Sequence, residues 1–153
     1  MDENRLTEAR GEIIRDFIEL ETMVNSAILL HYFKEISRPF YYEVLYDESF
    51  AFYFKLNILA KMVPRDKIHE SHIGKLRRLG EIRNYFAHRG TQFLSTGKLG
   101  ENGNGMVGVV PNPKKLDEAI DFDKLYEEFQ AKQPDEVRYL YELTTKIAES
   151  KLK

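Results

Sequence analysis

A short segment near the middle of the chain combines side chains suited to phosphodiester chemistry. It reads RNYFAH from Arg83 to His88. In a helix, Asn84 and His88 lie on one side because they are four residues apart. An imidazole changes charge near neutral pH and can move a proton, whereas a fixed guanidinium can hold a phosphate and stabilise developing charge. We therefore take Arg83 and His88 as candidate catalytic residues, with Asn84 as a supporting residue.

Arg83 also follows Leu76 and Leu79 on the apolar side of the same helical pattern. A charged residue at such a position must be buried with a partner or open into a cleft. Small residues, Gly80 and Ala87, flank it and permit close approach of another helix, either from the same fold or from a second subunit.

Two polar residues interrupt an apolar stripe earlier in the chain. Glu21 and Asn25 are four residues apart in a stripe that otherwise holds Ile14, Ile18 and Ile28. One interpretation is that they face the Arg83 and His88 cleft and orient one of its groups through hydrogen bonds. The other is that this part of the helix reaches solvent.

Positive charge is concentrated around the RNYFAH segment. Seven basic and three acidic residues lie between positions 65 and 89, so this stretch carries +4 and leaves −6 for the rest of a chain whose net charge is −2. A basic stripe can attract phosphate, although charge runs are also common on solvated helix faces. The candidate RNA-binding residues are Lys75, Arg77, Arg78 and Arg89.

Helical periodicity dominates the elements that must position these residues. Apolar residues recur at spacings of three and four over about 6–33, and Pro39 then marks a break. A second helix is expected over about 43–63 and a third over about 66–88. Asp66 can cap the third helix, and Gly90 suits its C-terminal end.

The remainder of the chain predicts a glycine-rich insertion followed by two shorter helices. Residues 91–113 are expected to form a long loop or a short β-hairpin, with a strand at 106–110. Helices are expected over 122–130 and over 134 to about 151, with Pro134 in the first turn. The sequence thus predicts a single all-α domain over 1–153, an antiparallel up-down bundle of four to five helices.

Composition excludes several classes of site. The chain has no cysteine, which rules out disulfides, thiolate catalysis and cysteine-based zinc sites. His69 and His72 lack a third ligand in the pattern, and we predict neither a metal nor another cofactor. No apolar run reaches the roughly 18 residues of a membrane span, so a cytoplasmic protein without membrane contact is expected.

The motif and the residues before it resemble the HEPN superfamily. The segments FKLNILAKMV and KLRRLGEIRNYFAH, within about 50–89, are similar to the mannitol-repressor-like branch of that superfamily. The resemblance implies a helical homodimer in which two R-x4-H motifs form one composite cleft. It further implies metal-independent RNA cleavage through the 2′-OH, with Arg83 and His88 at the catalytic positions.

The resemblance also implies two kinds of biological role. Many HEPN proteins are toxins paired with a nucleotidyltransferase-like antitoxin, or act in phage defence. Others cleave nothing and serve as regulators or interaction modules. In that alternative Arg83 bridges helices or subunits, His88 closes the helix, and the motif is structural.

Overall fold

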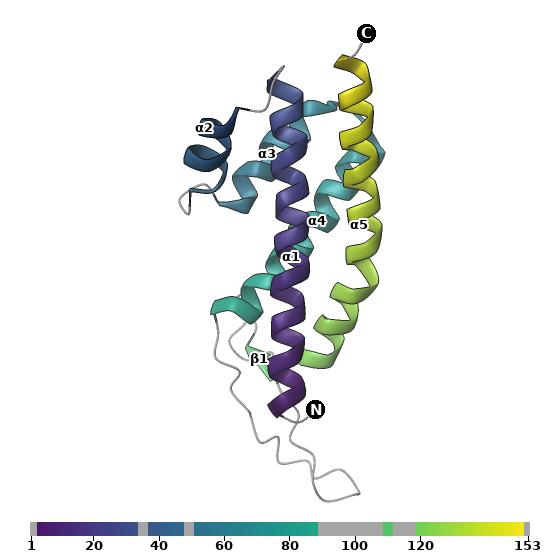
Figure 1. Cartoon of the computed structure of the whole chain (residues 1–153). Helices are drawn as coiled ribbons and strands as arrows, with labels where there is room; N and C mark the ends of the chain where they lie inside the picture. Colours follow the sequence, from purple (N-terminus) through teal and green to yellow (C-terminus); the bar gives the residue numbers. More distant parts are fainter. Residues whose placement is uncertain (1–2, 34–36, 48–50, 89–108, 112–118, 152–153) are drawn as a thin grey trace, which may run out of the picture.

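The computed structural model describes residues 3–33, 37–47, 51–88, 109–111 and 119–151. Four long helices form the body of the molecule (Figure 1). Their bounds, with those of two short helical segments and two strands, are α1 Glu3–Tyr32, α2 Arg38–Phe40, the π-helical η1 Tyr41–Leu45, α3 Phe52–Met62, α4 Lys67–His88, β1 Val109–Pro111, β2 Ala119–Asp121 and α5 Phe122–Lys151. The all-α class predicted from the sequence is confirmed, with one short two-stranded ribbon beside the helices in the described part of the chain.

The core forms where the apolar stripes of α1, α3, α4 and α5 meet. Helical spacing places one side chain per turn on the same side of a helix, so each stripe buries as a unit. On α1 the buried stripe is Ile13, Phe17, Leu20, Val24 and Ala27, and on α4 it is Ile73, Leu76, Leu79, Ile82 and Phe86.

Helix directions differ from the expected up-down order. Residue numbers increase together along α1 and α3 where the two helices touch: Phe17 contacts Phe52, and Glu21 contacts Lys55. These two helices therefore run in the same direction. Figure 1 shows α1 and α5 running side by side in the same direction, with α4 running the opposite way. Three long helices are therefore roughly parallel. The sequence periodicity defines which face of a helix is apolar but carries no information about its direction, which is why this expectation was wrong.

The region between α1 and α4 also differs from the single helix expected over 43–63. Two short segments, α2 and η1, precede α3, which begins only at Phe52. Ser37 caps α2, because its hydroxyl accepts a hydrogen bond from the backbone N–H of Phe40. Pro39 stands in the first turn of this segment, where a residue without an N–H costs nothing. The proline thus starts a helical turn here in addition to ending the previous pattern.

A single helix, α5, replaces the two helices expected on either side of Pro134. The proline lies inside α5, where it removes one backbone hydrogen bond and typically costs about 3 kcal/mol. Side chains on both sides of it are buried in the common core: Leu125 and Phe129 before, Leu140 and Leu143 after. Because both halves of α5 pack in the same core, the helix stays continuous. The helix propensities of the residues around Pro134 do not predict this continuity.

The ribbon β1–β2 precedes α5. Its strands pair antiparallel, with Val109 opposite Asp121. Residues 89–108 and 112–118, which include Gly90 and most of the expected insertion, lie outside the described residues. The expected loop or hairpin after the third helix therefore stays a prediction. Among the described helices none combines the length and the apolar character needed to cross a membrane.

Candidate functional site

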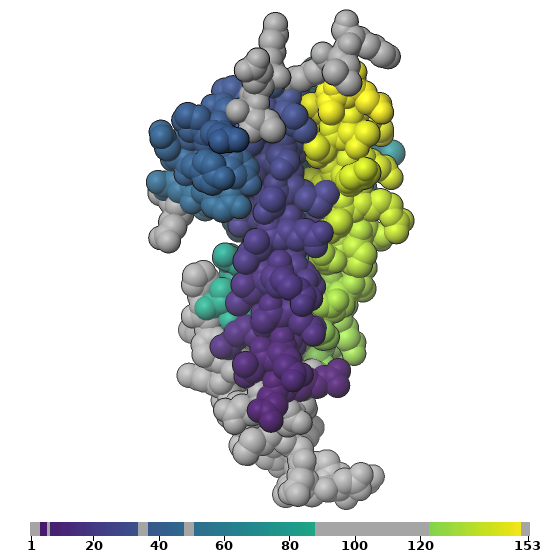
Figure 2. Space-filling view, viewed as in Figure 1, coloured from purple at the N-terminus to yellow at the C-terminus, as the bar shows by residue number. Residues whose placement is uncertain are grey.

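A cavity of about 740 Å³ opens beside α1, between η1, α3 and the C-terminal half of α4. Figure 2 shows the segments that border it, the blue residues before and within α3 and the teal residues of α4, on the same side of α1. We call it the α1–α4 cavity. It is lined by Phe17, Ile18, Glu21, Thr22, Asn25, Leu45, Tyr46, Asp47, Ala51, Phe52, Tyr53, Lys55, Gly80, Arg83 and Asn84.

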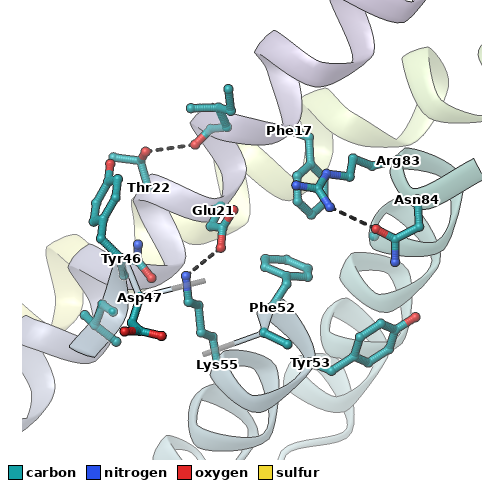
Figure 3. A pocket seen from close by; sticks show the side chains of 15 residues that line it. Phe17, Glu21, Thr22, Tyr46, Asp47, Phe52, Tyr53, Lys55, Arg83 and Asn84 are labelled. Atoms are coloured by element: carbon teal, nitrogen blue, oxygen red, sulfur yellow. Dashed lines mark hydrogen bonds and ion pairs between the residues drawn. The ribbon is translucent and has the colours of Figure 1, made fainter. Parts of the chain in front are cut away.

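Arg83 lies at one end of this cavity and is half-buried (Figure 3). Its guanidinium carbon stands 5.2 Å from the centre of the Phe17 ring, a cation–π contact between α4 and α1. Its Nη1 donates a hydrogen bond of 2.9 Å to Oδ1 of Asn84, which is exposed. No carboxylate is paired with Arg83 among the ion pairs of the described residues. The positive charge therefore faces the cavity and is available to an anion.

Glu21 forms an ion pair deeper in the cavity, although not with Arg83. The Nζ atom of Lys55 donates to its Oε1 over 2.5 Å. Lys55 is only 3% exposed, and this carboxylate offsets the cost of burying its side chain. Figure 3 shows the pair on the side of the cavity opposite Arg83, with Phe52 between them. Lys55 was not predicted as a site residue, because a lysine in a helix of mixed composition is normally exposed.

Asn25 lines the same cavity, one turn along α1 from Glu21, and is 2% exposed. Its Oδ1 accepts no hydrogen bond from the residues that the structure describes. A buried polar oxygen without a partner costs about 1–3 kcal/mol, so such a position calls for an explanation. The structure thus brings Glu21 and Asn25 to the wall of the cavity that also carries Arg83 and Asn84.

Aromatic side chains separate the two polar ends. The rings of Phe17 and Phe52 meet edge to face, with centroids 4.7 Å apart. Gly80 makes this contact possible, because a Cβ atom at that position would stand 3.1 Å from Cδ1 of Phe52. The small residue therefore accommodates a neighbour in the same fold, whereas Ala87 is exposed.

The mouth of the α1–α4 cavity carries apolar groups in contact with solvent. Ile18 is 55% exposed, Tyr46 52% and Tyr53 38%. Burial of its ring and the nearby Glu81 carboxylate raise the pKa of Tyr53, so its hydroxyl stays protonated and can donate. Such a rim suits contact with a nucleobase or with another protein surface.

His88 is the last residue of α4, one turn after Asn84. Its backbone position on this helix is described, but its side chain, like the whole of Arg89, lies outside the described residues.

Of the other residues predicted to bind RNA, Lys75 and Arg78 face α5 and Arg77 faces α3. Arg78 forms a double hydrogen bond with Glu128 of α5, at 2.9 and 2.8 Å, and its pKa is raised chiefly by that carboxylate. Lys75 also faces α5, with Nζ 3.6 Å from Oε1 of Glu136. Arg77 instead donates to Asn57 of α3 over 3.0 Å. The structure does not gather them into one basic stripe, and their role in RNA binding stays a prediction.

A second polar region lies between α4 and α5, and we call it the α4–α5 seam. On α4 its residues are three positions apart: His69, His72, Lys75 and Arg78. Their partners on α5 are Tyr139, Glu136 and Glu128. The α5 numbers fall as the α4 numbers rise, so the two helices are antiparallel.

Each histidine of the seam has partners on both sides. His69 donates through Nε2 to the carbonyl of Leu59 over 2.9 Å, which leaves Nδ1 to accept from the Tyr139 hydroxyl in the neutral ring. His72 stacks on Tyr139 at 3.8 Å and has Nδ1 2.8 Å from Oε2 of Glu136, a carboxylate with no exposed surface. No group of three potential metal ligands occurs within the described part of the chain.

Comparison of the chain with protein-family profiles, with characterised proteins and with solved structures gave no match.

Proposed function

We propose that this protein is a metal-independent endoribonuclease of the HEPN type, acting as a homodimer with a composite active site. Arg83 binds the scissile phosphate and stabilises charge on it, and His88 transfers a proton. The RNA 2′-OH attacks the neighbouring phosphorus, the bond to the 5′-oxygen breaks, and a cyclic phosphate and a 5′-hydroxyl result. A toxin or phage-defence role, with a nucleotidyltransferase-like antitoxin as partner and a cytoplasmic location, completes the proposal.

One observation carries the proposal: Arg83 is half-buried on the wall of an open cavity, five residues before His88 on the same helix. Among the described residues it is bound to Asn84 and to no carboxylate. A structural arginine at an interior position usually has a carboxylate partner, as Arg78 does. An arginine held by an amide and an aromatic ring keeps its full charge for a ligand. The predicted active-site arginine is therefore placed where a phosphate can reach it.

The test is cleavage of several classes of RNA by purified protein in EDTA. We expect the wild type to cleave and His88→Ala to be slower by about 10²-fold or more, as removal of an acid–base group typically causes. His31→Ala is the matched control, because His31 also lies in the last turn of a helix but does not line the cavity. Cleavage that needs a divalent metal, or equal rates in wild type and His88→Ala, would reject the proposal.

A second candidate is a non-catalytic regulator of the mannitol-repressor-like kind. The contact of Arg83 with Phe17 favours it, because this contact bridges α4 and α1 and so has a structural use. In that case Arg83→Ala unfolds or monomerises the protein. Under the ribonuclease proposal, the same variant loses RNA cleavage. Its oligomeric state stays the same, and its melting temperature changes no more than after a substitution on the surface.

A further inference from the structure

We infer that the inner wall of the α1–α4 cavity is a binding site for a guanine base. This inference rests on the proposed function, since it names which nucleotide of the RNA enters the cavity. The site is formed by Lys55, Glu21 and Asn25, on the side of the cavity away from Arg83.

Lys55 presents a donor, and the Glu21 carboxylate and the amide oxygen of Asn25 present acceptors. Lys55 Nζ is a donor beside Glu21 Oε1, at 2.5 Å. Asn25 lies one helical turn from Glu21 and holds an oxygen without a hydrogen bond among the described residues. An ammonium donates only and an ionised carboxylate accepts only, whereas the asparagine amide accepts through Oδ1 and donates through Nδ2.

Guanine offers the complementary set. Its Watson–Crick edge carries one acceptor, O6, followed by two donors, N1–H and N2–H₂. O6 can accept from Lys55, while the two donors face Glu21 and Asn25. Adenine and cytosine both present an amino donor in place of O6, opposite the ammonium, and uracil offers a single donor. A site with buried polar groups rejects bases that leave those groups without partners.

The shape of the cavity agrees with a nucleotide bound across it. Its volume of about 740 Å³ falls in the range of small-molecule sites, about 300–1,000 Å³. Phe52 lies between the polar wall and Arg83, and Tyr46 stands at the rim. Aromatic side chains are the usual partners for unstacked bases of single-stranded RNA. A base on the inner wall leaves its phosphate toward the Arg83 end.

The test is calorimetric titration of His88→Ala protein with 5′-GMP, 5′-AMP, 5′-CMP and 5′-UMP. The 5′-mononucleotides contain no internucleotide phosphodiester bond, so the titration reports binding alone. We expect GMP to bind at least 10-fold more tightly than the other three nucleotides. Asn25→Leu, introduced in the same background, should remove that preference, because leucine keeps the volume and lacks the oxygen.

The control is Ser26→Ala, a change at the next position of α1 whose hydroxyl bonds only to the carbonyl of Thr22 within the helix. It should leave GMP affinity unchanged. Equal affinity for all four nucleotides, no binding of GMP, or a preference that survives Asn25→Leu in a folded protein would overturn the guanine site. RNA cleavage by the wild type is measured in parallel. Cleavage without GMP preference rejects the guanine site alone, and GMP preference without cleavage rejects the ribonuclease proposal alone.

Discussion

The two sides of α4 differ in how their arginines are paired. On the α4–α5 seam, Arg78 and Lys75 both face carboxylates of α5, and even the fully buried Glu136 has a histidine and a lysine beside it. On the side of the α1–α4 cavity, Arg83 has no carboxylate partner in the described structure and Asn25 has an oxygen without a hydrogen bond. Each side also holds one buried oxygen without a hydrogen bond among the described residues, on Asn25 and on Glu136, so the contrast rests on the partners of the two arginines.

The seam arginine is held by a carboxylate of the fold, whereas the cavity arginine is held by an amide and an aromatic ring. The seam joins α4 to α5 through ion pairs and hydrogen bonds, and Oε1 of Glu136 has no hydrogen bond among the described residues. The cavity wall combines a cation, an amide oxygen and exposed aromatic rings. These are the groups that the proposed ligand would contact. Each prediction below changes one side and leaves the other intact.

The largest effect on stability is expected at Glu136. Its replacement by alanine removes the carboxylate that faces His72 and Lys75. Lys75 reaches solvent, so the cost comes from the lost hydrogen bond to His72 and from the space left in the interior, together about 2–3 kcal/mol. Urea unfolding should show this loss, with RNA cleavage retained where the protein is folded. Glu142→Ala, at an exposed position of α5, should stay within about 0.5 kcal/mol. Equal stability of the two variants would contradict a structural seam.

Arg78→Ala should have a smaller effect. It removes the double hydrogen bond to Glu128 and the weaker contact with Glu81. The side chains are partly exposed, so we expect a loss of about 1.5 kcal/mol. Arg77→Ala removes one exposed hydrogen bond to Asn57 and should cost less than about 0.5 kcal/mol. An Arg77→Ala protein that is less stable than Arg78→Ala would contradict the assignment.

The same ion pair predicts a dependence of stability on pH. Arg78, and then Lys132, lower the pKa of Glu128 from 4.5 to about 2. Between these values the unfolded chain binds more protons than the folded one, so stability rises with pH. The contribution is complete above about pH 4.5 and is lost as the pH falls toward 2. Unfolding measured across this window should show a shallower slope for Arg78→Ala than for the wild type. Identical slopes would contradict the shifted pKa.

The smallest effect on stability is expected at Gly80. Alanine gains up to about 1 kcal/mol of helix propensity, but its Cβ meets Phe52 at 3.1 Å. These terms oppose each other, so the melting temperature should change little. Phe52 must move, and cleavage should fall on the order of a few-fold, because small displacements of a binding wall reduce rates. Unchanged cleavage together with a lowered melting temperature would show that Gly80 contributes to stability and not to the cavity.

The sequence predicted the helical faces well and the long-range pairings poorly. The apolar stripes of α1 and α4 can be predicted from the spacing of apolar residues, because the position of a residue in a helix determines which side of the helix it lies on. The burial of Lys55 and Glu136 depends on partners 34 and 64 residues away, Glu21 and His72, which spacing does not reveal. The predicted break at Pro134 was wrong for a related reason. Core packing on both sides of the proline outweighs its local tendency to end a helix. The polar residues in the α1 stripe stood out, but only the fold shows that they share a cavity wall with Arg83.

The most direct test compares two arginines of one helix, Arg83 and Arg78, each replaced by alanine. RNA cleavage in EDTA and thermal melting are measured on both proteins at a temperature where both are folded. We expect Arg83→Ala to lose cleavage by about 10²-fold or more with a melting temperature near that of the wild type. Arg78→Ala should instead melt earlier and still cleave. An Arg83→Ala protein that cleaves like the wild type, or that loses stability as Arg78→Ala does, would contradict the functional role of the cavity.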